Sequence, residues 1–184
     1  MSLMEEYGID DPSVEIPLLI LSFHKGDSLN ELHIHKITRY FQYIKKKNYV
    51  TFSNFRKGDV SYEIQESLEE LNSYDLIDKF DENCEITPLG EEVTKEIIKT
   101  YDEETIKQLN LAYNRLKNMD DDELMFFMYN LLPESKKNST QLSRLLKNKI
   151  QLTKSLYRKG LISKYTGAKW LEISEKSFDE FVSK

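Results

Sequence analysis

A block of positive charge is the feature of this sequence that most directly suggests chemistry. Ten basic residues and no acidic residue lie between Lys136 and Lys169, although the whole chain of 184 residues carries a net charge of −6. The ten are Lys136, Lys137, Arg144, Lys147, Lys149, Lys154, Arg158, Lys159, Lys164 and Lys169. Cations concentrated in this way favour a polyphosphate partner. The block predicts a DNA-binding surface. The alternatives are a lysine-rich face exposed to solvent and a binding site for an acidic protein.

Apolar and turn residues around this block are spaced as in a helix-turn-helix motif with a β-hairpin wing. Helices are predicted at 124–132, 139–147 and 149–159. Gly160 then supplies the positive φ of a helix end. Residues 161–165 and 169–173 predict two strands around a tight turn, and Ser174 caps a short final helix.

The third helix of a helix-turn-helix lies in the major groove of DNA. If Ile150, Leu156 and Leu161 face the core, the opposite side of this helix points outward. Helix starts favour a phosphate, and a wing meets the sugar-phosphate backbone. The predicted DNA contacts are therefore Ser139, Thr140, Arg144, Lys149, Gln151, Lys154, Ser155, Arg158, Lys164 and Lys169.

Residues that could serve an enzyme or a metal site are scarce. His24, His33, His35 and Cys84 are too few and too poorly spaced for a metal site, so we expect them in the core or on the surface. The chain has no phosphate-binding loop, dinucleotide fingerprint or nucleophile elbow. We therefore expect a protein that is not an enzyme and has no catalytic residues, cofactor or metal.

Composition places the protein in a reducing compartment. A single cysteine excludes an intrachain disulfide. No apolar run approaches the length of about 18 residues that a membrane span requires. The first eleven residues are acidic, which argues against a secretory signal. We expect a cytoplasmic protein that does not contact a membrane, with residues 1–14 disordered or derived from a tag.

The first half of the chain predicts a similar order of elements with the opposite charge. Helices are predicted at 15–24, 30–47, 60–73 and 88–100, an extended segment at 49–55, and a β-hairpin from strands 76–80 and 84–87. The third of these helices carries Glu63, Glu66, Glu69 and Glu70 and no basic residue. Carboxylates repel phosphates, so this helix is a poor reader of DNA and better suits a basic protein partner.

Two stretches resemble winged-helix regulators. Asp75-Leu76-Ile77 followed by 86–90 (Ile-Thr-Pro-Leu-Gly) is similar to their "GLI … LTPxG" ending, with Asp75 in place of glycine, and 157–162 is similar to "LxxKGLI". More narrowly, residues 15–98 resemble the helical domain of Panacea-type antitoxins at 34–44, at 58–62, where the family's proline is absent, and at 87–90. The resemblance implies a prokaryotic antitoxin-like domain.

Residues 101–118 predict a helix that connects the halves. Ile106, Leu109, Tyr113 and Leu116 form an apolar stripe, for which we favour packing within the chain over the seam of a homodimer. The expected fold is mainly α with short β-hairpin wings. It comprises an acidic winged-helix-like domain at 15–100 and a basic winged-helix domain at 119–184.

The expected function is DNA binding by a transcriptional regulator through its C-terminal winged helix. The alternative is a protein-interaction module, an antitoxin or adaptor, that covers a basic partner with the acidic domain.

Overall fold

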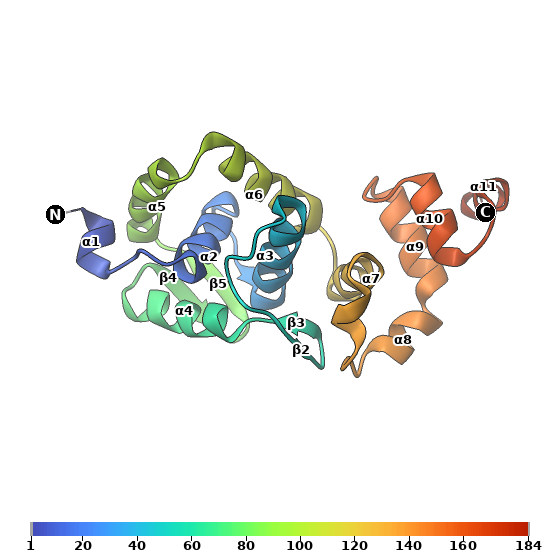
Figure 1. The fold of residues 1–184 in the computed structure, drawn as a ribbon, viewed down its shortest axis with the longest axis horizontal. Coiled ribbons are helices and arrows are strands. Elements are labelled where there is room, and N and C mark those ends of the chain that lie inside the picture. The colour runs from blue at the N-terminus through green and yellow to red at the C-terminus, as the bar shows by residue number, and fades with distance from the viewer. Residues whose placement is uncertain (1, 184) are drawn as a thin grey trace. The chain divides into compact units, whose positions relative to one another are not determined.

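The computed structural model describes residues 2–183 and is mainly helical, with small antiparallel sheets (Figure 1). The chain divides into two compact units. Unit 1 comprises residues 1–53 and 59–117, and unit 2 comprises residues 54–58 and 118–184.

The elements follow the chain in this order. Up to residue 117 they are α1 (Leu3–Tyr7), α2 (Pro12–Phe23), β1 (Leu29–Asn30), α3 (Glu31–Lys45), β2 (Ser53–Phe55), β3 (Gly58–Val60), α4 (Tyr62–Ser73), β4 (Ile77–Phe80), β5 (Asn83–Ile86), α5 (Pro88–Thr100) and α6 (Glu103–Leu116). After it come α7 (Asp121–Leu131), a 3-10 turn (Pro133–Lys136), α8 (Leu142–Lys147), α9 (Lys149–Arg158), α10 (Lys164–Leu171) and α11 (Glu175–Val182).

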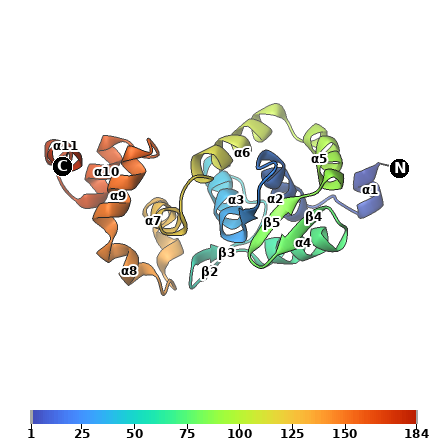
Figure 2. The same ribbon diagram turned by 180° about the vertical axis from the view of Figure 1, so that it is seen from behind.

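Helix α2 forms the centre of unit 1. Every residue from Val14 to Ser22 is buried, because α3, α4, α5 and α6 all pack against this helix. A helix that is apolar on all sides is stable only where neighbours cover it on all sides. Figure 2 shows α2 enclosed by these helices and by the hairpin of β4 and β5.

The sheet of unit 1 has the strand order β1-β5-β4, and both pairs are antiparallel. Ile77 pairs with Ile86, and Leu29 pairs with Cys84. Asp81 takes a left-handed φ of 53° in the tight turn between β4 and β5. The predicted hairpin is thereby confirmed, and so is the helix that begins at Pro88.

Residues 87–90 (Thr-Pro-Leu-Gly) fix the start of α5 against the end of α4 and the beginning of this hairpin. The Thr87 hydroxyl donates to the carbonyl of Asp75 (2.7 Å) and accepts the N–H of Gly90 (3.1 Å), which caps α5. A Cβ at Gly90 would lie 2.1 Å from the carbonyl oxygen of Leu76. Only glycine allows this close approach of helix and strand.

Helix α6 belongs to unit 1 and does not merely connect the halves. Leu109, Tyr113 and Leu116 are buried where α6 packs against α3. The expectation of packing within the chain is confirmed.

Of the two expectations for residues 1–14, disorder or derivation from a tag, disorder is wrong for the described part, 2–14. Ser2 and Glu5 form a capping box at the start of α1, and the N–H of Met4 donates to the Glu96 carboxylate (3.1 Å). Ile9 is buried, and Asp11 caps α2. Caps and apolar anchoring thus order the segment. Met1 lies outside the described residues.

The predicted wing of the second half is also wrong, because residues 164–171 form helix α10. The Ser163 hydroxyl caps this helix by accepting the N–H of Thr166 (3.1 Å). Gly167 lets the ring of Phe178 approach the helix backbone, and Ala168 and Leu171 pack in the same cluster. Burial at positions 168 and 171 requires helical rather than alternating spacing.

Unit 2 is completed by a short stretch from much earlier in the sequence. Strands β2 and β3 form a hairpin, and residues 54–58 of this hairpin belong to unit 2. The carbonyl of Arg56 accepts the N–H of Thr140 (3.2 Å) and the hydroxyl of Ser139 (3.2 Å). The predicted extended segment at 49–55 is a strand only from Ser53 onward.

Candidate nucleic-acid interface

The two units carry opposite net charge. Unit 1 contains 12 basic and 23 acidic residues, whereas unit 2 contains 14 basic and nine acidic residues. Only unit 2 therefore has the charge that phosphate binding requires.

Helix α9 presents a polar outer face. Leu152 and Leu156 are buried, while Gln151 and Arg158, which lie seven residues apart and so share a face, are exposed. Lys149 at the start of the helix is half-buried. The prediction that Ile150 faces the core is wrong. This side chain is 45% exposed because it lies about 160° around the helix from Leu152.

Two other predicted contacts on α9 are held by the protein itself. The ammonium of Lys154 lies over the ring of Phe181, 5.3 Å from its centroid, and donates to the Phe181 carbonyl (3.5 Å). The Ser155 hydroxyl donates to the buried carboxylate of Glu123 (2.5 Å). These side chains stabilise unit 2 and are not directed into solvent as predicted.

Ion pairs neutralise three cations of the block. Arg144 binds Asp122 with two hydrogen bonds, one of 2.6 Å, and Lys164 binds Asp179. Lys159 pairs with Glu123 at 2.5 Å. Burial raises the pKa of Glu123, but the hydrogen bonds from Lys159 and Ser155 outweigh it and leave the pKa below its usual value. Glu123 therefore joins α7 firmly to α9.

The phosphate site predicted at Ser139 and Thr140 does not form. Helix α8 begins later, at Leu142, and has only six residues. The Ser139 hydroxyl accepts from Tyr129 (2.6 Å) and from the N–H of Gln141 (3.1 Å), and it donates to Arg56. Its hydrogen-bonding capacity is thus used within unit 2.

Lys164 and Lys169 do not flank a hairpin turn, because both lie on α10. Lys169 is exposed. The neighbouring Trp170 packs edge-on against Phe126 and Phe127, at centroid distances of 5.6 and 6.0 Å, so its ring belongs to the core of unit 2.

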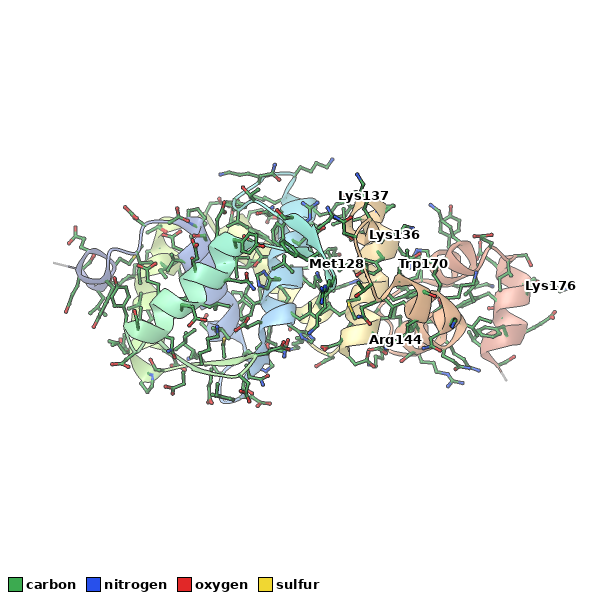
Figure 3. All side chains as sticks on the ribbon, turned by 90° about the horizontal axis from the view of Figure 1, so that it is seen from below. Met128, Lys136, Lys137, Arg144, Trp170 and Lys176 are labelled. Atoms are coloured by element: carbon green, nitrogen blue, oxygen red, sulfur yellow. The ribbon has the colours of Figure 1, made fainter. Side chains whose placement is uncertain are left out.

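The cations of unit 2 do not gather on a single face. Figure 3 shows Lys137, Arg144 and Lys176 on different sides of the unit. The structure brings together a smaller set where α8 meets α9, which we call the α8–α9 corner. It consists of Leu146, Lys147, Lys149, Ile150 and Gln151, with Arg158 two turns further along α9.

Arg56 is an exposed cation of unit 2 that lies outside the block of ten basic residues. Docking of the hairpin against residues 138–140, more than 80 positions later, brings it there. No short-range sequence pattern predicts a contact between segments so far apart in the chain.

Unit 1 presents a pocket and an acidic helix. The pocket, of about 380 Å³, is lined by Arg39, Gln42, Asn48, Tyr49, Val50, Thr51, Phe52 and Glu63. Its polar groups already bind the protein: Gln42 accepts the N–H groups of residues 49 and 50, Glu63 accepts that of Thr51, and Arg39 pairs with Asp59 at 2.8 Å. Glu63, Glu66, Glu69 and Glu70 are exposed on α4.

The histidines and the cysteine lie in the core or at its edge, as expected. His33, His35 and Cys84 are buried, and His24 is hydrogen-bonded to the hydroxyl of Tyr113 (2.9 Å). Burial, followed by the charge of Lys36, lowers the pKa of His35 to about 3, so this side chain stays neutral. Among residues 2–183, no three His, Cys, Asp or Glu side chains are grouped as a metal site.

None of the helices between residues 2 and 183 combines the length and apolar character that crossing a bilayer requires. No protein-family model, curated protein or solved structure matches this chain.

Proposed function

We propose that this protein binds duplex DNA through unit 2, with the outer face of α9 and the α8–α9 corner against the nucleic acid. The observation that carries the proposal is that Gln151 and Arg158 are exposed on one face of α9, in the unit with net positive charge, and that Lys147 and Lys149 lie close by in sequence where α8 meets α9. Arginine and lysine contact phosphate or guanine, and glutamine pairs with adenine.

The arrangement of unit 1 supports assignment to the winged-helix class. Helices α2, α3 and α4 precede the hairpin of β4 and β5, and β1 completes a sheet of order β1-β5-β4. Helix α4, in the position of a recognition helix, carries the four exposed carboxylates. In this protein the DNA-binding role therefore falls to α9, and a regulator of transcription is the class that we infer.

Charge reversal at Lys147 and Arg158 tests the proposal. Both side chains are exposed, so Lys147→Glu/Arg158→Glu should fold normally and bind random duplex DNA at least about tenfold more weakly. The matched control is Lys137→Glu/Lys176→Glu, which changes the charge of unit 2 equally but away from α9.

Fluorescence anisotropy at several salt concentrations provides the measurement. Binding of the wild-type protein should weaken with salt at a log–log slope between about −3 and −7, which corresponds to roughly four to eight phosphates. Equal affinity of the wild type and the α9 variant, or an equal loss in the control, would overturn the proposal.

A second candidate function is the binding of a basic protein by unit 1, as an antitoxin or adaptor would do. One observation favours it: α4 exposes carboxylates together with Tyr62, which is 57% exposed. Aromatic side chains are enriched at protein interfaces. Glu66→Lys/Glu70→Lys should abolish binding of labelled oligolysine to unit 1, and unchanged binding would exclude this role.

A further inference from the structure

The α8–α9 corner exposes apolar surface that DNA binding does not explain. Leu146 is 52% exposed and Ile150 is 45% exposed, four residues apart on either side of Asn148. Lys147 and Lys149 lie between them in the sequence. Binding of phosphates requires only the cations. Exposed aliphatic side chains surrounded by polar groups are typical of a protein interface instead.

The partner of this corner should combine negative charge with apolar side chains. The α4 face of unit 1, defined as Tyr62, Glu66, Glu69, Glu70 and the neighbouring Phe80, has both. Tyr62 is 57% and Phe80 49% exposed, and the acidic side chains are exposed between them along α4 and β4. The only cation between residues 60 and 86 is Lys79, which pairs with Glu31 and Glu69.

We propose that the α8–α9 corner of one molecule docks on the α4 face of a second copy of the same chain. Lysines 147 and 149 then meet Glu66 and Glu70, and Leu146 and Ile150 meet the exposed rings. Charge complementarity carries this choice of occupant, since unit 2 has a surplus of five positive charges and unit 1 a surplus of eleven negative charges.

A lipid surface is a less suitable occupant of the corner. Helix α8 has only six residues, and two aliphatic side chains bury little area in a bilayer compared with the apolar face of a membrane-binding helix. The inference rests on the second candidate function, and it commits that function to one partner. It does not depend on DNA binding, and because DNA would cover the same corner, the docked arrangement is that of the protein free of DNA.

Sedimentation velocity of the full chain without DNA tests the proposal. The wild type should self-associate with a concentration dependence that weakens at high salt, because the charges are exposed. Leu146→Ser/Ile150→Ser should sediment as a monomer. The matched control is Ile98→Ser/Leu111→Ser, which removes an isoleucine and a leucine that are 40% and 53% exposed on α5 and α6 of unit 1.

A charge exchange gives the sharper result. Glu66→Lys/Glu70→Lys and Lys147→Glu/Lys149→Glu should each be monomeric alone, because each places like charges on both sides of the contact. Their equimolar mixture should associate again, since opposite charges face each other once more. Thermal unfolding of each variant verifies that it is folded.

Three outcomes would overturn the proposal. These are a monomeric wild type at every concentration, an unchanged Leu146→Ser/Ile150→Ser variant, or a mixture of charge variants that stays monomeric. If the wild type is monomeric yet its α4 face still binds oligolysine, the self-docking fails while the second candidate function stands. If the corner variant instead loses binding to phosphatidylserine vesicles, the occupant is a membrane and not a second copy.

Discussion

Helix α4 of unit 1 and helix α9 of unit 2 end in the same way, yet the next segment of the chain folds differently. A left-handed residue closes each helix, Asp75 after α4 and Gly160 after α9, with φ values of 56° and 69°. Leu76 and Leu161 come next, and the N–H of each donates to the carbonyl five residues earlier, at 3.0 and 2.9 Å. The two helix ends are structurally equivalent.

The element after each helix end depends on its tertiary partners. In unit 1 the next residue, Ile77, pairs with Ile86 in a sheet that Thr87 and Gly90 hold in place. In unit 2 the chain reaches Ser163, which caps α10, and Trp170 packs against α7. A helix end is therefore encoded locally, whereas the element after it is selected by the surface on which it packs.

Alanine substitutions at the two glycines that permit these contacts should destabilise the two units to different extents. A Cβ at Gly90 would meet a backbone carbonyl at 2.1 Å, and a Cβ at Gly167 would meet the ring of Phe178 at 2.5 Å. The Leu76 carbonyl cannot move without disrupting the sheet, whereas the Phe178 side chain can rotate away from the new methyl group. Gly90→Ala should cost unit 1 about 3 kcal/mol or more and Gly167→Ala should cost unit 2 about 1 to 2 kcal/mol, as measured by denaturant unfolding.

A second substitution separates the two mechanisms. Phe178→Leu should reduce the further cost of Gly167→Ala, because the smaller side chain leaves room for the methyl group. Ile86→Val should leave the cost of Gly90→Ala largely intact, because the obstacle is the Leu76 carbonyl. A larger loss of stability from Gly167→Ala than from Gly90→Ala would contradict this explanation.

A pH titration should distinguish the units by sign. Burial raises the pKa of Glu15 in unit 1 above 4.5, although the hydrogen bond from Tyr101 acts in the opposite direction. Its contribution to stability is complete below pH 4.5 and is lost as the pH rises through the raised folded pKa. Glu123 in unit 2 has a lowered pKa, so its contribution is complete above pH 4.5 and is lost as the pH falls through the lowered folded pKa.

Glutamine substitutions isolate these contributions from the other carboxylates. Glu15→Gln should flatten the loss of unit 1 stability above pH 4.5, and Glu123→Gln should flatten the loss of unit 2 stability below it. Denaturant unfolding across this pH range is the measurement. Changes of the same sign in both variants would contradict the assignment.

The helix starts could be predicted, because the residues that cap a helix are encoded in the local sequence. Asn30 caps α3, Thr87 with Pro88 begins α5, and Asp120 caps α7, as their residue types indicate. Thr166 and Gly167 also look like a turn between strands. Their helical conformation results from contacts with Phe178 and α7, which the local sequence does not contain.

The residues of the candidate site also fall into a predictable group and an unpredictable group. The outward positions of Gln151 and Arg158 follow from the helical period and are correct. Lys154 and Ser155 are predicted on the same face, but their partners, Phe181 and Glu123, come from distant segments. A periodic pattern gives the direction of a side chain and not whether another part of the chain will bind it.

Substitutions that exchange the two left-handed residues, Asp75 and Gly160, should change stability only slightly. Asp75→Gly should stabilise unit 1 by about 0.5 kcal/mol, because glycine adopts a left-handed φ without the steric cost of a Cβ. Gly160→Asp should destabilise unit 2 by about 0.5 to 1 kcal/mol, because a residue with a Cβ adopts a left-handed φ at a steric cost. No atom lies within 4 Å of a Cβ built at Gly160, so this backbone strain is the whole cost. Denaturant unfolding of the two variants measures both changes. Gly160→Ala, which lacks the local hydrogen bonds that help aspartate in this conformation, should cost slightly more than Gly160→Asp. If Asp75→Gly destabilises unit 1 instead, the aspartate side chain must stabilise that helix end, and the equivalence of the two ends would hold for the backbone alone.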